Sequence, residues 1–355
     1  MDFTLTNEQK SLAAAVREMV GRRQVEPGEN GAGPRPHDAE LWAAMAETGL
    51  LGLPFAEEAG GFGATAIEVF VAAQALGAAG VQTAYADALL AGSLLADAGD
   101  DLLEAVVGGE AFVLPAFAEP MRAFAPVPGG VHASEGSDGW TLDGIKGPIP
   151  FGEAATHVIA SALDGEETVL VLIEAPGIED GLLAAGAGAG RVLLRGAAAD
   201  EAVTRAIALA SVVLAGQGLG AMESALSMTT EYLKTRKQFG VPLASFQTLT
   251  QRAADMYVSL ELARSAAMYL AMAVAEGDTD PAIVARSRVV LGRTGRHIGQ
   301  EAIQLHGGIA MTAEYAVGHL TAMLTAIEHT YGDTRQHLGA LAGQVSDYGT
   351  VAVLT

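Results

Sequence analysis

Two stretches of this sequence combine residue types that could hold a phosphate-bearing ligand. The first runs from Arg236 to Leu243 (RKQFGVPL) and continues through Phe246 and Gln247. An arginine that ends a long helix, followed by an aromatic residue and a Gly-Val-Pro turn, can present its guanidinium fork to a diphosphate. The same residues also suit an ordinary helix-turn-helix with a solvated arginine. Residue types alone leave both interpretations open.

The second stretch runs from Gln300 to Gly308 (QEAIQLHGG). A helix that ends in two glycines exposes backbone amides that a ligand can approach closely, because neither glycine carries a side chain. A plain glycine C-cap would have the same sequence. This stretch is therefore a second candidate binding segment with an equally simple structural alternative.

Other conspicuous patterns favour structural roles. Gly216 to Gly220 (GQGLG) resembles a dinucleotide-binding loop, but it lies inside a helical pattern and follows no strand, so we interpret it as close helix packing. His329 and His337 could share a helix face, yet solvated or capping roles explain them as well. No histidine spacing indicates a metal site, and no Gly-x-Ser-x-Gly indicates a serine hydrolase.

Composition narrows the classes of function. The 355 residues include 20 basic and 42 acidic side chains, a formal net charge of −22. This charge argues against nucleic acid and anionic membranes as partners, because both require a basic surface. The absence of cysteine excludes disulfides, thiolate-held metals and a cysteine nucleophile.

The sequence favours a cytoplasmic protein that does not span a membrane. Met1 to Thr6 has neither the basic region nor the apolar region of a signal peptide. The longest uncharged runs, Val69 to Ala86 and Ala206 to Met222, are short for a bilayer span and contain glutamine and glycine. We therefore expect both to be buried helices.

The predicted secondary structure that positions these segments differs between three regions of the chain. Helical patterns occupy roughly the first 100 residues, beginning at a capping box formed by Thr6 and Gln9. Short apolar runs separated by Gly, Pro and Asp then predict β structure, and helical periodicity returns from Glu201. We predict a mainly α protein with a middle β domain, divided as 1–110 (helical), 111–200 (β) and 201–355 (helical bundle).

Taken together, the two candidate segments resemble the acyl-CoA dehydrogenase family, and the resemblance covers nearly the whole chain. It implies an N-terminal helical domain, a β-barrel-like middle domain, a C-terminal four-helix bundle, bound FAD and a tetramer. Six stretches carry the resemblance: Trp42, Gly49 to Pro54, Gly60 to Gly63, Gly139 to Lys146, Tyr232 to Gln247, and Glu301 to Tyr315.

The catalytic base of that family is absent here. Family members remove the α-proton of an acyl-CoA thioester with a glutamate, usually in a Tyr-Glu-Gly-Thr motif, while the flavin takes the β-hydride. The matching run here begins at Tyr331 (YGDT), so Gly332 stands at the glutamate position and Asp333 is only a weak candidate. The family's other base position falls on Ala210, and Ser211 replaces its usual arginine.

The flavin cradle also departs from the family. Its Thr-Glu-Pro and Gly-Ser-Asp motifs correspond here to Ala118 to Pro120 and Ala123 to Ala125. Pro148 and Pro150 replace the aromatic and hydroxyl residues that usually follow the β-domain lysine. Proline has neither a hydroxyl nor a backbone N–H to donate. With the missing base, these changes indicate an inactive site of its own.

The segments that reach a neighbour's FAD are nevertheless retained. In this family they contact the ADP half of FAD across a subunit interface, which implies a partner subunit that carries the catalytic glutamate. Actinobacterial heterotetramers that dehydrogenate steroid side-chain CoA esters are built in this way. The resemblance implies these cofactor-binding residues: Arg236, Gln238, Phe239, Leu243, Phe246, Gln247, Gln304, Leu305, Gly307 and Gly308.

The leading hypothesis is a non-catalytic subunit of a heteromeric acyl-CoA dehydrogenase, with FAD shared across the interface and an electron-transfer flavoprotein or similar acceptor. Two alternatives remain. One is a homotetrameric dehydrogenase in which Asp333 serves as a relocated base. The other is a flavin-free scaffold with the same fold.

Overall fold

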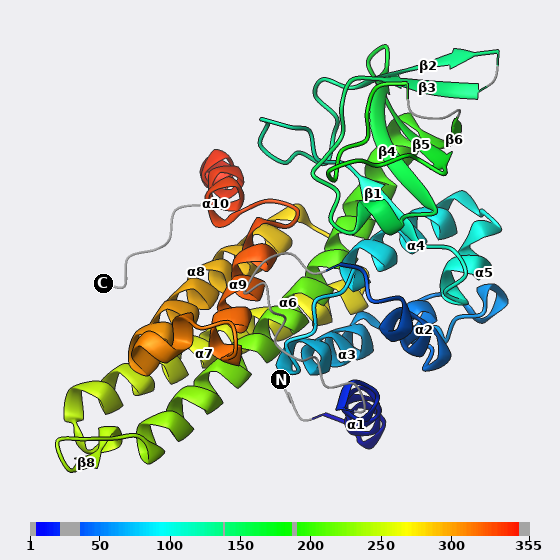
Figure 1. Cartoon of the computed structure of the whole chain (residues 1–355). Coiled ribbons are helices and arrows are strands. Elements are labelled where there is room, and N and C mark those ends of the chain that lie inside the picture. Colours follow the sequence, from blue (N-terminus) through cyan, green and yellow to red (C-terminus); the bar gives the residue numbers. More distant parts are fainter. Residues whose placement is uncertain (1–4, 22–35, 138, 187–189, 348–355) are drawn as a thin grey trace, which may run out of the picture.

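The computed structural model describes residues 5–21, 36–137, 139–186 and 190–347. In chain order it has a helical part, a β part and a second helical part (Figure 1). This arrangement confirms the predicted fold class. The helices of the first part are α1 (Asn7–Gly21), α2 (Ala39–Glu47), α3 (Ala66–Ala78), α4 (Tyr85–Ala98) and α5 (Leu102–Val107).

Local sequence sets where two of these helices begin. Before α1, the backbone N–H of Thr6 donates to Gln9 Oε1 at 3.0 Å and Gln9 N–H donates to Thr6 Oγ1 at 3.2 Å, which confirms the predicted capping box. A second capping box, formed by Thr65 and Glu68, begins α3. Each box satisfies amide groups that the first turn of a helix otherwise leaves unpaired.

The β part is a six-stranded sheet that closes on itself. Strand order is β1-β4-β2-β3-β6-β5, and β4 also pairs with β5. The β4–β5 pair is antiparallel along its whole length, and both strands are almost entirely buried, as near-continuous apolar runs predict. The strands are β1 (Val113–Ala116), β2 (His132–Gly136), β3 (Gly139–Asp143), β4 (His157–Asp164), β5 (Glu167–Glu174) and β6 (Gly190–Arg195).

The second helical part is organised around α6 (Gly196–Thr235), a helix of 40 residues. Residue 200, the predicted end of the β domain, lies inside this helix. The other helices are α7 (Gln247–Ala275), α8 (Pro281–His306), α9 (Ala316–His329) and α10 (Thr334–Gly343). Short 3-10 helices cover Leu50–Gly52, Glu57–Ala59, Gly152–Ala154, Leu243–Ser245, Gly307–Met311 and Val345–Asp347.

The GQGLG run belongs to the contact between α3 and α6. A Cβ added to Gly220 would lie 2.1 Å from the carbonyl oxygen of Gln74, and one added to Gly77 would lie 2.0 Å from that of Gln217. The backbones of the two helices therefore approach more closely than side chains permit. This finding confirms the helix-packing interpretation of the glycines.

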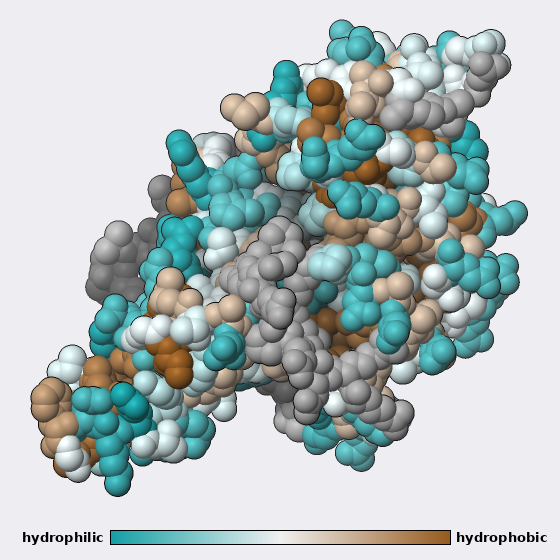
Figure 2. Space-filling model, viewed as in Figure 1, coloured by the Kyte–Doolittle hydropathy of each residue, from teal (hydrophilic) through white to brown (hydrophobic). Residues whose placement is uncertain are grey.

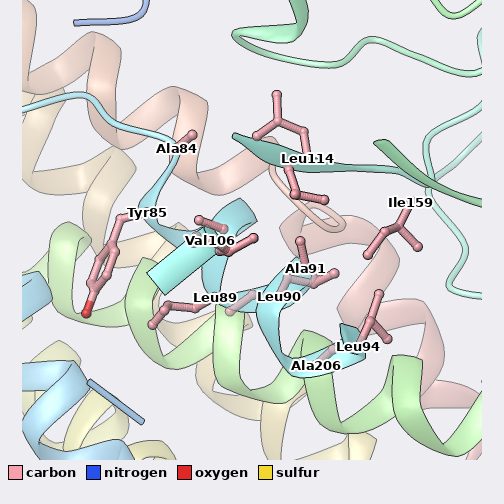
Figure 3. Close-up of a cluster of buried hydrophobic side chains, with 14 of the residues drawn as sticks. Ala84, Tyr85, Leu89, Leu90, Ala91, Leu94, Val106, Leu114, Ile159 and Ala206 are labelled. Carbon is pink, nitrogen blue, oxygen red and sulfur yellow. The ribbon is translucent and has the colours of Figure 1, made fainter. Parts of the chain in front are cut away.

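Helix α4 joins the three parts through one hydrophobic core. Leu90 and Leu94 of α4 lie in the same buried cluster as Leu114 and Ile159 of the sheet and Ala206 of α6 (Figure 3). Burying a large aliphatic side chain contributes roughly 1.5–3 kcal/mol. The position of α4 is thus fixed against both the β part and the bundle.

Two helices, α6 and α7, are long and apolar enough to cross a membrane by length and composition alone. The most apolar window of α6 is 78% buried within the protein, whereas that of α7 is only 28% buried. Such helices are weak evidence for a membrane span, because the core helix of a soluble protein passes the same test.

Candidate functional site

The Arg236 segment forms a tight hairpin between α6 and α7. The backbone N–H of Arg236 donates to the Tyr232 carbonyl at 2.8 Å, and the Arg236 carbonyl accepts from Leu243 N–H at 2.8 Å. Between them lie two short strands, β7 (Lys237–Gln238) and β8 (Val241–Pro242). Phe239 and Gly240 connect these strands with φ values of +55° and +83°, as a two-residue hairpin requires.

The side chains of this hairpin point into solvent. Phe239 is 92% exposed, with its ring edge-on to that of Phe246 at 6.2 Å. Arg236 and Gln238 are exposed as well, and within the described ranges Arg236 forms no ion pair. An exposed phenyl ring and an unpaired guanidinium on the same hairpin suit contact with a flat, anionic ligand or another subunit.

The C-terminal end of α8 lies at the same end of the bundle. The His306 ring sits 4.6 Å from Tyr232 of α6 and 5.1 Å from Tyr315, measured between ring centroids. Nothing lies within 4 Å of a Cβ built on Gly307 or Gly308, so their backbone is open to approach. The two candidate segments therefore converge. Figure 2 shows this end of the bundle projecting from the body at lower left, with hydrophobic and hydrophilic side chains mixed on it.

The predicted cofactor residues differ in accessibility. The Leu305 side chain is 5% exposed and packs in the core of the bundle, so only its backbone is available to a ligand. Leu243 and Phe246 are half-buried. The others are exposed: Arg236, Gln238, Phe239, Gln247, Gln304, Gly307 and Gly308.

Gly332, at the expected base position, has a backbone that only glycine adopts readily. Its φ is +101°, and an added Cβ would lie 3.1 Å from Nε2 of His337. Arg288 stabilises this backbone, because its Nη2 donates to the carbonyls of Thr330 at 2.6 Å and Gly332 at 3.2 Å. Burial lowers the pKa of Arg288 to about 10. A glutamate is thus absent, and the local backbone does not suit one.

The two remaining base positions, Asp333 and Ala210, have structural roles. Asp333 caps α10: its Oδ1 accepts from Gln336 N–H at 2.8 Å, and its own N–H donates to Gln336 Oε1 at 2.9 Å. The carboxylate is therefore directed at a helix N-terminus. Ala210 is fully buried within α6 and offers no polar side-chain atom. We find no observation that favours Asp333 as a relocated base.

A carboxyl group close to this region was not predicted from the sequence. Asp87 of α4 accepts a hydrogen bond from the hydroxyl of Tyr331, the residue before Gly332. Asp87 also lines a cavity of about 580 Å³ between α4, α6, α9 and the Pro150–Phe151 segment of the β part. Burial raises the pKa of Asp87 to about 6, against the lowering effect of the Tyr331 hydrogen bond. One signal was present, since Asp87 is the only charged residue between Val81 and Ala96.

Comparison with known proteins decides the family. The model of the acyl-CoA dehydrogenase N-terminal domain matches residues 6–104, and that of the C-terminal domain matches residues 201–344. The chain belongs to the acyl-CoA dehydrogenase family. Together the two matches cover both helical parts, which include the hairpin, the Gly307–Gly308 backbone and the cavity walls on α4 and α9.

Several acyl-CoA dehydrogenases resemble the chain over almost its full length. FadE27 of Mycobacterium tuberculosis is 26% identical over 98% of this chain and 99% of its own length. A variant of the Tcur3481-Tcur3483 steroid acyl-CoA dehydrogenase is 27% identical, with a TM-score of 0.86 over 97% of this chain and 99% of that one. The ChsE4-ChsE5 complex of M. tuberculosis shares the fold, with 23% identity and a TM-score of 0.83 over 99% of this chain and 100% of that one.

Acyl-CoA dehydrogenases of this fold bind flavin, as in the FADH2 complex of a glutaryl-CoA dehydrogenase from Mycobacterium smegmatis. The projecting end of the bundle is chemically suited to the ADP half of FAD, because the hairpin offers a guanidinium and an exposed phenyl ring and the backbone of Gly307 and Gly308 is uncovered. The β part fits the flavin ring poorly. Phe124 stands where a serine is expected and packs edge-on to Tyr331 at 5.6 Å, while Gln336 donates to its carbonyl at 3.4 Å.

The lysine that follows the β2–β3 hairpin has a structural role. Lys146 is fully buried, and its Nζ donates to Glu119 Oε1 at 3.0 Å and to Ser161 Oγ at 3.2 Å. Burial lowers the pKa of Lys146, while the Glu119 carboxylate opposes that change. A buried ion pair of this kind fixes the hairpin of the β part against β4.

Proposed function

We propose that this chain is a subunit of a heteromeric acyl-CoA dehydrogenase and helps to bind FAD across the interface to a catalytic partner. The reaction is the α,β-desaturation of an acyl-CoA thioester. The observation that carries the proposal is a contrast between two ends of the molecule. The projecting hairpin keeps exposed groups suited to a diphosphate, whereas the base position has become a glycine with φ of +101°.

The hairpin acts outside its own subunit. Arg236 pairs with the diphosphate of FAD, Gln238 and Phe239 shape the adenosine pocket, and the segment from Gln304 to Gly308 approaches the ligand through the side-chain-free backbone of Gly307 and Gly308, because the Gly307 N–H itself already donates to the Ile303 carbonyl. The location of the hairpin supports this role, because the hairpin lies at the end of α6 farthest from the β part (Figure 1). A group in that position meets a cofactor held mainly by another chain.

The chain's own site lacks acid–base chemistry in this proposal. Gly332 and Ala210 supply no carboxylate, and the Asp333 carboxylate caps α10. Loss of a general base typically lowers a rate by ~10²–10⁴. The flavin that the hairpin helps to hold therefore reacts in the partner's active site, beside the partner's glutamate.

A partner is also supported by the surface of α7. Val258 and Leu262 on this helix are 67% and 57% exposed, and Tyr269 is 43% exposed. Their spacing of four and seven residues places them on one face. An apolar helix face of this kind is typical of a subunit interface. With a net charge of −22, repulsion between identical chains favours a less acidic partner.

The relatives support a proposal for the substrate class. We infer an acyl-CoA ester with a steroid side chain, on the basis of the likeness to the Tcur3481-Tcur3483 steroid enzyme. An electron-transfer flavoprotein or similar acceptor would reoxidise the flavin. We further expect a cytoplasmic complex without nucleic acid or membrane partners.

The test compares two neighbouring cations at the end of α6. Arg236→Ala and Lys234→Ala are each introduced into the chain, which is co-expressed with a homologue that contains the intact Tyr-Glu-Gly-Thr motif. Lys234 is the control, because it is exposed and already pairs with Glu231 at 2.7 Å. The proposal predicts that Arg236→Ala lowers the FAD content of the purified complex by about tenfold or more at limiting FAD. Equal FAD content in both variants would contradict it.

A further inference from the structure

The ring of His306 joins the two segments that the proposed function assigns to FAD. His306 is the last residue of α8 and directly precedes Gly307. Its ring lies 4.6 Å from that of Tyr232 in the last turn of α6, measured between centroids. The Tyr232 carbonyl in turn accepts the backbone N–H of Arg236 at 2.8 Å. One ring therefore connects the backbone before Arg236 to the backbone before Gly307.

Hydrogen bonding and packing hold this ring in one orientation. Its Nδ1 lies 2.8 Å from the carbonyl oxygen of Ala302, and because a carbonyl can only accept, Nδ1 carries the hydrogen. The ring of Tyr315 also packs against it, at 5.1 Å between centroids. The His306 side chain is 4% exposed, and burial lowers its pKa, so the imidazole is neutral at pH 7. The ring therefore cannot move without breaking these contacts.

The ligand groups of the two segments depend on the placement of their backbones. The Arg236 side chain is exposed and forms no ion pair in the described part of the chain. Gly307 has no side chain, and its φ of +70° turns the chain at the end of α8. One cofactor that contacts both segments requires them at a fixed separation. Freedom between the segments must be lost on binding, and that loss lowers the affinity.

We propose that His306 is a positioning residue for FAD binding. Its ring, packed against Tyr232 and tied to Ala302, holds Arg236 and the Gly307–Gly308 backbone at the separation that the cofactor requires. The His306 side chain does not touch FAD, because it is buried. This inference rests on the proposed function, since it names the residue that sets the geometry of the same site.

The affinity for FAD of the complex with a homologue that contains the Tyr-Glu-Gly-Thr motif tests this role. His306→Leu should weaken FAD binding about threefold to tenfold, as the loss of one aromatic contact predicts. His306→Phe keeps a ring against Tyr232 but has no hydrogen to donate to Ala302, so its affinity should lie between those of His306→Leu and the natural complex. It also remains informative if His306→Leu does not fold. Natural FAD affinity in both variants would overturn the inference.

A double-mutant cycle separates positioning from a general effect on stability. In the Arg236→Ala background, His306→Leu should change the FAD affinity by less than about twofold, because the ring acts through the arginine. Leu233→Ala is the control, since Leu233 lies in the same turn of α6 as Tyr232 but is buried in the core of the bundle. Its effect should be equal in both backgrounds. An equal effect of His306→Leu in both backgrounds would contradict a positioning role.

Amide hydrogen exchange of the complex before FAD is added separates this inference from the function on which it rests. His306→Leu should speed exchange of the Arg236 and Leu243 amides, which close the hairpin, by about threefold or more. Unchanged exchange at these amides refutes the inference, whatever the FAD affinity. Faster exchange, together with an Arg236→Ala complex that binds FAD normally, refutes the proposed function but leaves the connection through His306 in place.

Discussion

Replacing Asp87 by asparagine is expected to stabilise the protein at alkaline pH, although it removes a carboxylate. Burial raises the pKa of this carboxyl from 3.8 to about 6. The folded state thus holds the proton more tightly than the unfolded state, so stability falls as the pH rises from about 4 to about 6. A pKa difference of about two corresponds to about 3 kcal/mol.

Asparagine carries no charge at any of these pH values, and its Oδ1 can still accept the Tyr331 hydroxyl hydrogen. We compare the free energy of unfolding of the variant with that of the natural protein at each pH. This difference should shift in favour of the variant by up to about 3 kcal/mol between pH 4 and pH 8. Thermal unfolding of both proteins across this pH range measures the gain, with a Tm difference of a few degrees expected near pH 8.

Asp97→Asn provides the matched control, because Asp97 lies on the same helix and pairs with Arg205 at 3.1 Å near the surface. It should give no stabilisation at high pH. A constant Tm difference between Asp87→Asn and the natural protein at all pH values would refute the reasoning. So would a variant that is less stable near pH 8.

Three further predictions concern stability and catalysis. Gly332→Glu should not create dehydrogenase activity in the lone chain, and it should lower stability by about 1–3 kcal/mol, because φ is +101° and the new Cβ would meet His337 at 3.1 Å. Gly220→Ala should lower the Tm by several degrees, since its Cβ would lie 2.1 Å from a carbonyl oxygen of α3, whereas Gly218→Ala, whose nearest neighbour is 3.8 Å away, should be tolerated. Arg288→Met should cost about 3 kcal/mol in denaturant unfolding, because the carbonyls it contacts lose their donor. Unchanged unfolding midpoints for these variants would contradict the corresponding contacts.

Local chemistry made much of the fold predictable. The Thr6 and Gln9 side chains satisfy one another's backbone within four residues, so their pairing follows from the sequence alone. The buried strand β5 is an apolar run between charged residues. The glycines of α6 could be distinguished from a nucleotide-binding loop because they lie inside a continuous helical pattern.

Features that depend on distant segments could not be predicted in this way. Asp87 and Tyr331 are separated by 244 positions, and their hydrogen bond depends on the fold bringing α4 beside the turn between α9 and α10. The positive φ of Gly332 is likewise set by Arg288 and the start of α10. The pattern could therefore show that a glutamate is missing, but it could not show that the backbone would no longer suit one.

The stoichiometry of FAD tests the central claim most directly. The chain is purified alone and together with a homologue that contains the Tyr-Glu-Gly-Thr motif, and flavin is measured by absorbance against protein concentration. The account predicts little FAD in the lone chain, and about one FAD per pair of chains in the complex, because only the partner has an intact flavin pocket with a base. One FAD per chain in the lone protein, together with dehydrogenase activity, would contradict it.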